Sequence, residues 1–161
     1  NYIKFRGSIM DNTDLKILAC LKENARINTS VIGERINMSV SAVSERIRKL
    51  ENLGIIKQYT VILDHKLIGK DLLSYISVSL EHPKYNENFI NSIDKNSQVI
   101  ECHYTTGDFD FLLKVITDSA AALSDVLNEI KSISGVSLTR TLIVLSTSKS
   151  DVSVLPEFME T

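Results

Sequence analysis

The stretch that decides the fold is residues 37–54, which read NMSVSAVSERIRKLENLG. Ser39 can cap the start of a helix, and Gly54 supplies the left-handed residue that ends one. Between them, apolar side chains recur at the i, i+4 and i+7 spacing of a single helix face, at Val43, Ile47 and Leu50. The pattern predicts a helix from residue 39 to residue 53.

Two further amphipathic patterns precede that helix, over residues 11–25 and 28–37. In the first, apolar side chains recur every three or four positions, at Leu15, Leu18, Leu21 and Ala25. Its first turn carries Asp11 and Asp14, which favour the positive end of a helix dipole. The second starts at Asn28, a possible cap, and only Asn37 and Met38 are available to connect it to the helix that starts at Ser39. Such a short connection is typical of a helix-turn-helix, which we expect, in a winged-helix-like form, over residues 10–54.

The outer face of the predicted third helix is polar. Counted from Val43 at about 100° per residue, this face comprises Ser41, Glu45, Arg48 and Lys49, about 140° to 240° away. A major groove admits one helix, so a face of this kind can reach base edges and phosphates. The candidate DNA-binding residues are Asn28, Thr29, Ser39, Ser41, Ala42, Ser44, Glu45, Arg46, Arg48 and Lys49. The alternative is that these charges only solvate an ordinary amphipathic helix.

Charge is divided unevenly along the chain, although the formal net charge is only −2. Residues 1–66 contain 11 Lys or Arg and 7 Asp or Glu, whereas residues 67–161 contain 7 and 13. The first part can therefore approach phosphates, and the second would repel them. This division favours nucleic-acid binding by the N-terminal part alone.

The second half alternates between strand and helix patterns. Residues 55–63 predict a linking strand, in a linker that extends to residue 71. Four strand patterns follow, at residues 76–80, 99–106, 109–116 and 136–147. A helical pattern lies between the first two strands, with apolar residues Phe89, Ile90 and Ile93. Another lies between the last two, with apolar residues Leu123, Val126, Leu127, Ile130 and Ile133. The order predicts an α+β fold, a ferredoxin-like βαββαβ sandwich over residues 72–147, with one sheet face left for a partner. Residues 148–161 are expected to be an irregular tail.

Composition excludes several classes of protein. No apolar run approaches the roughly 18 residues that span a membrane, so a cytoplasmic protein is expected. Neither Cys20 and Cys102 nor His65, His82 and His103 show a metal-ligand spacing, and we expect neither a metal nor a cofactor. Catalytic motifs are also missing, so we do not expect an enzyme. Met10 precedes the first helix directly, and we expect it to be the native start, with residues 1–9 added ahead of it.

The segments 14–18 and 43–56, which read DLKIL and VSERIRKLENLGII, resemble the Lrp/AsnC, or feast/famine, family of prokaryotic transcriptional regulators. The likeness continues through the linker and the segment TGDFD at residues 106–110, and it spans residues 10–147. Two residues depart from the family pattern: Val40 stands where proline is frequent, and Gly33 where alanine is usual. Neither threatens the fold, because an interior glycine costs only about 1 kcal/mol relative to alanine.

The resemblance implies that residues 72–147 form dimers through their sheets, that dimers assemble into tetramers or octamers, and that an amino acid binds between dimers near Gly107. The residues add that Asp108 could hold an ammonium group and that backbone amides near Gly107 could receive a carboxylate. The candidate effector-binding residues are Tyr104, Thr105, Gly107, Asp108, Asp110, Thr139 and Thr141, provided that the second and fourth strands lie close together. Alternatively, residues 107–108 are only a hairpin turn and Asp110 a solvent-facing strand residue.

The predicted function is therefore a sequence-specific DNA-binding transcriptional regulator, modulated by an amino acid or a related small molecule. Its partners would be double-stranded DNA, other copies of itself and the effector, but not a membrane. A rival function is a ligand-binding or assembly module that does not bind DNA. A salt titration separates the two functions, because phosphate contacts make the affinity for DNA fall steeply as salt rises. An enzyme is the more distant alternative.

Overall fold

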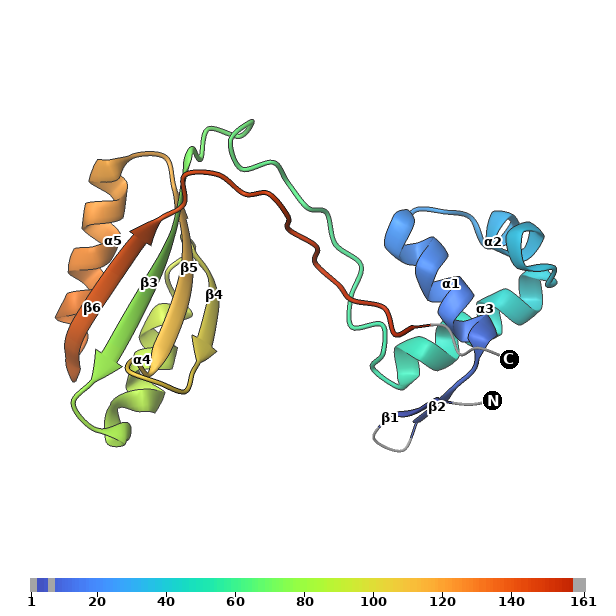
Figure 1. The fold of residues 1–161 in the computed structure, drawn as a ribbon, viewed down its shortest axis with the longest axis horizontal. Coiled ribbons are helices and arrows are strands. Elements are labelled where there is room, and N and C mark those ends of the chain that lie inside the picture. Colours follow the sequence, from blue (N-terminus) through green and yellow to red (C-terminus); the bar gives the residue numbers. More distant parts are fainter. Residues whose placement is uncertain (1–2, 6–7, 158–161) are drawn as a thin grey trace. The chain divides into compact units, whose positions relative to one another are not determined.

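The computed structural model describes residues 3–5 and 8–157, and Figure 1 shows how their helices and strands are arranged. The chain divides into two compact units. Unit 1 comprises residues 1–61 and 149–161, and unit 2 comprises residues 62–148. The prediction that residues 1–9 precede the native start falls partly outside the described residues and stays a prediction.

Unit 1 contains three helices after a short antiparallel pair of strands, β1 (Ile3–Phe5) and β2 (Ser8–Met10). The helices are α1 (Asn12–Glu23), α2 (Thr29–Ile36) and α3 (Val40–Asn52). Their apolar faces meet in one core, whose fully buried members include Leu15, Ile17, Ile32, Val43 and Leu50. The three helices therefore lie within a few residues of the predicted ranges.

The turn between α2 and α3 depends on two special residues. Asn37 ends α2 in the left-handed conformation with φ 56°, and the Met38 N–H donates to the Gly33 carbonyl at 2.9 Å. A Cβ atom at position 33 would lie 2.5 Å from the Met38 carbonyl oxygen, far inside contact distance. Glycine at this position is thus required by the close approach of the turn, and the departure from alanine has a steric reason.

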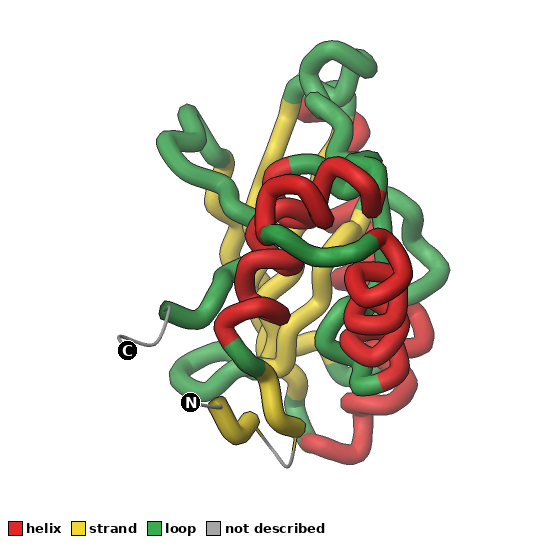
Figure 2. Tube along the Cα trace, turned by 90° about the vertical axis from the view of Figure 1, so that its right-hand side faces the viewer, coloured by secondary structure: helices red, strands yellow, loops and turns green. Residues whose placement is uncertain are grey.

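The predicted linking strand was wrong. Residues 55–71, all of which the structure describes, contain no strand and are drawn as loop in Figure 2. Val61, Ile62 and Leu63 are 78%, 71% and 62% exposed. Their β-branched, apolar pattern matches a strand, but a strand is stabilised by pairing and side-chain packing, and this segment has no neighbouring strand in the described chain.

Unit 2 is a four-stranded antiparallel sheet covered by helices. Its elements follow in the order β3 (Leu72–Leu80), η1 (Pro83–Tyr85), α4 (Asn86–Ile93), β4 (Val99–Tyr104), β5 (Phe111–Thr117), α5 (Ala120–Ser132) and β6 (Val136–Ile143). The strand order across the sheet is β4-β5-β3-β6. This arrangement confirms the predicted ferredoxin-like α+β fold.

The two faces of the sheet differ in character. On one face, Ile76 and Val78 of β3 and Leu113 of β5 are fully buried against Phe89 of α4 and Val126 of α5. The opposite face, here called the open sheet face, carries the alternate residues of the strands: Tyr75, Ser77 and Ser79 of β3, Leu112, Lys114 and Ile116 of β5, Glu101 and His103 of β4, and Leu138, Arg140 and Leu142 of β6. No helix of unit 2 packs on the open sheet face among the described residues.

Several boundaries differ from the predicted ones. Strand β5 begins at Phe111 and not at residue 109, and β6 ends at Ile143 and not at residue 147. Ile90, expected on the apolar side of α4, is 47% exposed. The tail from residue 148 to 157 has no helix or strand, as expected, and its residues 149 and 151–155 line a hollow of about 580 Å³ beside Lys22 of α1.

Candidate nucleic-acid interface and ligand-binding region

The outward face of α3 presents the side chains expected of a DNA-reading helix. Ser41, Glu45, Arg48 and Lys49 are all exposed. Within the described part of the chain, Arg48 has no ion pair or hydrogen bond. A long, uncommitted guanidinium on a solvent-facing helix can reach either a guanine edge or a phosphate.

The start of α3 is held by serines. The Ser39 Oγ accepts from the Ala42 N–H at 3.3 Å and lies 3.1 Å from the Ser41 Oγ, so both hydroxyls remain at the exposed end of the helix. The Ser44 hydroxyl instead donates to the Val40 carbonyl at 2.9 Å, and Ala42 and Ser44 are partly buried. Ser39 and Ser41 are therefore better placed than Ser44 to meet a ligand.

The N-terminus of α2 supplies the other two candidates. Asn28 occupies the cap position and is exposed, but its side chain makes no capping hydrogen bond, and Thr29 behind it is partly buried. Free amide and N–H groups at a helix start suit phosphate contacts. Asn28 is the more accessible of the two residues.

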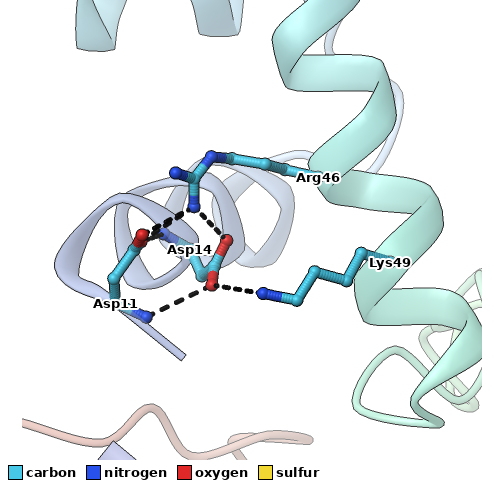
Figure 3. Close-up of polar contacts among 4 residues, drawn as sticks. All are labelled: Asp11, Asp14, Arg46 and Lys49. Carbon is cyan, nitrogen blue, oxygen red and sulfur yellow. Dashed lines mark hydrogen bonds and ion pairs between the residues drawn. The ribbon is translucent and has the colours of Figure 1, made fainter. Parts of the chain in front are cut away.

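Arg46 is placed differently from the prediction. Its Nη1 lies 2.9 and 2.8 Å from the two carboxylate oxygens of Asp11 and 2.8 Å from the Asp14 Oδ1 (Figure 3). Both aspartates lie at the start of α1 and form a capping box. The Asp11 side chain accepts from the Asp14 N–H, and the Asp14 side chain accepts from the Asp11 N–H. The Arg46 side chain therefore points to α1, and we remove it from the DNA-facing set.

The electrostatics of this cluster favour the charged forms. Burial raises the pKa of the Asp11 carboxyl, but the Asp14 backbone N–H and the Arg46 guanidinium outweigh it, and the pKa is lowered from its ordinary value. The hydrogen bond to Asp14 raises the pKa of Arg46 further above its already high value. Both shifts favour the charged forms of Asp11 and Arg46.

Sequence reasoning treated Asp11 and Asp14 only as residues favourable to a helix start and grouped Arg46 with the DNA contacts. Arg46 is 32 positions from Asp14 and 35 from Asp11 in the sequence, and no local spacing rule predicts contacts over such separations. One signal was available: counted from Val43, Arg46 lies about 60° from the centre of the apolar stripe, closer to it than Arg48.

The segment 105–110, which joins β4 to β5, is a six-residue hairpin loop closed by the Thr105 N–H on the Asp110 carbonyl at 2.8 Å. Gly107 has φ 113°, a conformation that side-chain-bearing residues rarely adopt. Asp108 is exposed, and its carbonyl accepts from the Ser79 hydroxyl at 3.2 Å. The loop is therefore both a hairpin turn and a fixed platform that presents the Asp108 side chain.

Asp110 lies in the loop before β5 begins and is partly buried, so it is not a solvent-facing strand residue. Its Oδ2 accepts from the Leu80 N–H at 2.7 Å, at the point where the pairing of β3 with β6 shifts register. The Thr105 hydroxyl is likewise used inside the loop, donating to the Phe109 carbonyl at 2.9 Å. Both side chains therefore already make hydrogen bonds within the fold.

The second and fourth strands of unit 2, which were expected to lie close together, are not neighbours within one chain. Tyr104 lies on β4 and Thr139 and Thr141 on β6, which are opposite edges of the sheet, with β5 and β3 between them. Three strand spacings amount to about 14 Å. Tyr104 is therefore not grouped with Thr139 and Thr141 within one protomer, because topology, and not sequence order, decides which strands are neighbours.

A different side chain approaches the loop. The Arg140 Cζ lies 5.0 Å from the centre of the Phe109 ring, a cation–π contact that joins β6 to the residue after Asp108. Separately, a shallow hollow of about 350 Å³ lies beside the edge strand, lined by Lys131, Val136, Ser137, Leu138 and Thr139. Among the described residues no group of His, Cys, Asp and Glu could hold a metal ion, and no helix is long and apolar enough to cross a membrane.

A capped helix-turn-helix with an exposed basic face, followed by a separate α+β unit with an uncovered sheet, defines a class: a DNA-binding regulator with a ligand-binding domain. Two family descriptions match the chain accordingly. Residues 10–57 match "Winged helix-turn-helix DNA-binding", and residues 73–154 match "Lrp/AsnC ligand binding domain".

Individual relatives agree along most of the chain. The HTH-type transcriptional regulator FL11 of Pyrococcus horikoshii is 35% identical over 140 residues, which cover 87% of this chain and 92% of that protein. The leucine-responsive regulatory protein of Escherichia coli (strain K12) is 32% identical over 142 residues, covering 86% and 87% of the two chains.

Solved structures agree as well. A transcriptional regulator of Neisseria meningitidis, in complex with L-methionine, has a TM-score of 0.86 at 33% identity, with 90% of this chain and 96% of that chain covered. E. coli AsnC has a TM-score of 0.86 at 29% identity, with 92% and 100% covered. The chain belongs to the Lrp/AsnC family and is a DNA-binding transcriptional regulator.

Proposed function

We propose that this regulator reads its operator with the outward face of α3 and responds to an amino acid held near the loop 105–110. The observation that carries the first part is the uncommitted Arg48 beside Ser41, on a helix whose N-terminus is exposed. The proposed DNA contacts are Asn28, Ser39, Ser41, Glu45, Arg48 and Lys49, with Thr29, Ala42 and Ser44 as partly buried supports.

A mobility-shift titration on the DNA upstream of its own gene tests this assignment. Arg48→Ala should weaken operator binding by about 1–3 kcal/mol if it reads a guanine, or weaken all sequences alike if it holds a phosphate. Lys16→Ala, which removes an exposed charge from α1, is the matched control. Unchanged binding by the Arg48 variant to both kinds of DNA would remove Arg48 from the interface.

The open sheet face supports assembly with a second copy of the chain. Leu138 and Leu142 of β6 are 56% and 59% exposed on it, beside Tyr75. Apolar side chains gathered on an uncovered sheet are typical of an interface, and a two-fold dimer would present two copies of α3 to a roughly palindromic operator. We propose this dimer and its further assembly into tetramers or octamers, in the cytoplasm, where operator DNA is found.

Light scattering tests the dimer. Leu142→Asp should shift the protein to monomers, because a charge would be buried between the two sheets, whereas Leu145→Asp, which changes an exposed leucine beyond the end of β6, should not. A dimer that persists in the Leu142 variant argues against this face.

The effector site rests on chemistry around the loop. Asp108 is exposed, and its carboxylate has no hydrogen bond or ion pair in the described chain, while Arg140 contacts the neighbouring Phe109. An acidic and a basic group on adjoining segments suit the ammonium and carboxylate of an amino acid. The relatives' names include leucine, and a neighbouring structure contains L-methionine, so these two are the first candidates.

Calorimetry with L-leucine and L-methionine tests this site. Asp108→Ala and Arg140→Ala should each weaken binding at least about tenfold, equivalent to losing one charge-assisted hydrogen bond. Asp125→Ala, an exposed aspartate on α5, should not. Unchanged affinity in both the Asp108 and the Arg140 variant would place the effector elsewhere.

A further inference from the structure

The start of α1 and the middle of α3 meet through a buried carboxylate. The Asp14 side chain is 0% exposed, and its oxygens face the Asp11 N–H at 3.2 Å, the Arg46 Nη1 at 2.8 Å and the Lys49 Nζ at 3.8 Å (Figure 3). A charge taken out of water is tolerated only when it is paired and hydrogen-bonded. Asp14 therefore requires a cation from α3.

Arg46 is the cation that meets this requirement. Its side chain is 30% exposed, and its three short contacts all go to carboxylate oxygens of α1. The Lys49 ammonium, at 3.8 Å and with half of its side chain exposed, is the weaker partner. Arg46 and Arg48 are only two residues apart, yet one is committed to the protein and the other faces solvent.

The ion network constrains α3 in a way that its apolar contacts do not. Packing of Leu50 and Val43 in the core excludes water but leaves α3 some freedom to rotate about its axis, because hydrophobic contact is non-directional. A guanidinium bound to two carboxylates is directional. It fixes both the rotation of α3 and its position relative to α1.

Small rotations matter at the end of a side chain. Side-chain ends lie about 5–6 Å from a helix axis, so a rotation of about 10–20° moves them by roughly 1–2 Å. A binding constellation needs its groups held within about 0.5 Å of the productive geometry. Base readout by Ser41 and Arg48 would therefore suffer from a rotation that leaves the fold intact.

We propose that Arg46 is a positioning residue for operator recognition: through Asp11 and Asp14 it sets the orientation of α3, and it makes no contact with DNA. This proposal rests on the DNA-reading role of α3 described above. It assigns to Arg46 a part in sequence discrimination and none in phosphate binding.

The experiment compares Arg46→Gln with Arg48→Gln in the full-length protein. Each variant is titrated by fluorescence anisotropy with the operator duplex and with a scrambled duplex of equal length and composition, over a range of salt concentrations. Melting curves set the temperature so that every variant is folded, and Lys16→Gln serves as the control for the removal of a surface charge.

Arg46→Gln should weaken operator binding about tenfold, with scrambled-duplex affinity within twofold of wild type and an unchanged slope of log affinity against log salt. Arg48→Gln should lower that slope by about 0.9 for each phosphate that it no longer binds, or weaken the operator alone if Arg48 reads a base. Asp14→Asn should reproduce the Arg46→Gln result, and the double variant should bind the operator no more weakly than either single one.

Two outcomes would overturn the proposal. A salt slope reduced by about 0.9 in Arg46→Gln, with equal losses of affinity on both duplexes, would mean that Arg46 binds a phosphate. Wild-type affinity for the operator in Arg46→Gln would show that the network does not set the orientation of α3. If Arg46→Gln does not fold, Arg46→Lys, which keeps the charge but loses the planar fork, must show the same selective loss of operator affinity.

The controls separate this proposal from the DNA-binding assignment. Wild-type behaviour of Arg48→Gln on both duplexes would remove Arg48 from the DNA surface, and wild-type behaviour of both variants would contradict the outward face of α3 as that surface. A selective loss in Arg46→Gln beside a normal Arg48→Gln would keep the positioning role and shift the readout to other residues of α3.

Discussion

In unit 1 the candidate DNA-binding side chains belong to α3 and its cap, apart from Asn28 and Thr29 at the start of α2, whereas in unit 2 candidate effector-binding side chains are divided between opposite edges of one sheet. The outward face of α3 is assembled by local geometry, because residues three and four apart always share a helix face. A site on a sheet depends on which strands pair, and on which copies of the chain meet. The two units therefore differ in how directly their sites follow from sequence order.

The largest expected effect tests whether the two units are also independent in stability. Each has its own buried core. Leu50→Ala, at a fully buried position of α3, should lower the free energy of unfolding of unit 1 by about 2–5 kcal/mol. Hydrogen exchange should show faster opening of α1–α3 and unchanged protection of β3 and β5. Faster exchange in both units would mean that the cores unfold together.

Gly33→Ala tests the close turn that orients α3. The new Cβ would lie 2.5 Å from a backbone carbonyl, so the turn must shift. We expect a loss of about 1–3 kcal/mol in thermal or urea unfolding, in spite of the better helix propensity of alanine. A control is Gly54→Ala, where nothing lies within 4 Å of the new Cβ and only the positive φ is strained. A stabilised Gly33 variant would contradict the steric account of this turn.

Asp11 gives unit 1 a pH dependence. Its folded pKa is lower than its ordinary value of 3.8, so its stabilising contribution is complete above about pH 4 to 5 and is lost as the pH falls through the folded pKa. Asp11→Ala should cost about 1 kcal/mol at pH 7 by removing the cap of α1. Asp11→Asn keeps a capping side chain without titrating, and its unfolding free energy should fall less steeply between about pH 4 and 2 than that of wild type. Parallel curves would exclude Asp11 as the titrating group.

The smallest effect concerns the point where the linker leaves α3. The Tyr59 hydroxyl donates to the Glu51 carboxylate at 2.9 Å, and burial together with this carboxylate raises the pKa of Tyr59 to about 12. Because the folded pKa is raised, the stabilisation from this hydrogen bond is complete below about pH 10 and is lost as the pH rises through the folded pKa of about 12, where the phenol ionises. Tyr59→Phe should destabilise unit 1 by less than about 1 kcal/mol, since the pair is exposed. The difference between the absorbance titrations of wild type and Tyr59→Phe isolates this phenol and checks the shifted pKa.

Most of the fold could be predicted from sequence. Ser39, Asn37 and Gly54 behave as their local chemistry requires, and the alternation of Ile76 and Val78 with serines identified a half-buried strand. The exception is the segment 55–63, where a strand-like composition met no partner strand. Strand propensity expresses side-chain packing on a sheet more than a backbone preference, so composition alone could not decide the matter.

The candidate sites could be predicted only in part. Arg48 and Ser41 follow from helix geometry, but Arg46 was assigned to the DNA surface although it binds Asp11 and Asp14. Asp110 and Thr105 carry the right chemistry for a ligand, yet the Asp110 carboxylate accepts from the Leu80 N–H of β3 and the Thr105 hydroxyl donates to the Phe109 carbonyl of the same loop. Residue type shows which groups are able to bind, whereas hydrogen bonds already made within the fold decide which groups remain available.

The sequence by itself determined the helix-turn-helix and the order of strands and helices, because caps, turns and apolar periodicity act over a few residues. Only the tertiary structure decided that Arg46 anchors α3 to α1 while Arg48 faces outward, and that β4 and β6 lie at opposite edges of the sheet. These features join residues distant in sequence, and the burial of Asp14 that calls for Arg46 exists only once α1 and α3 have packed. The outward face of α3 can thus be recognised from residues 37–54 alone, but the orientation in which it is held depends on residues near the start of α1.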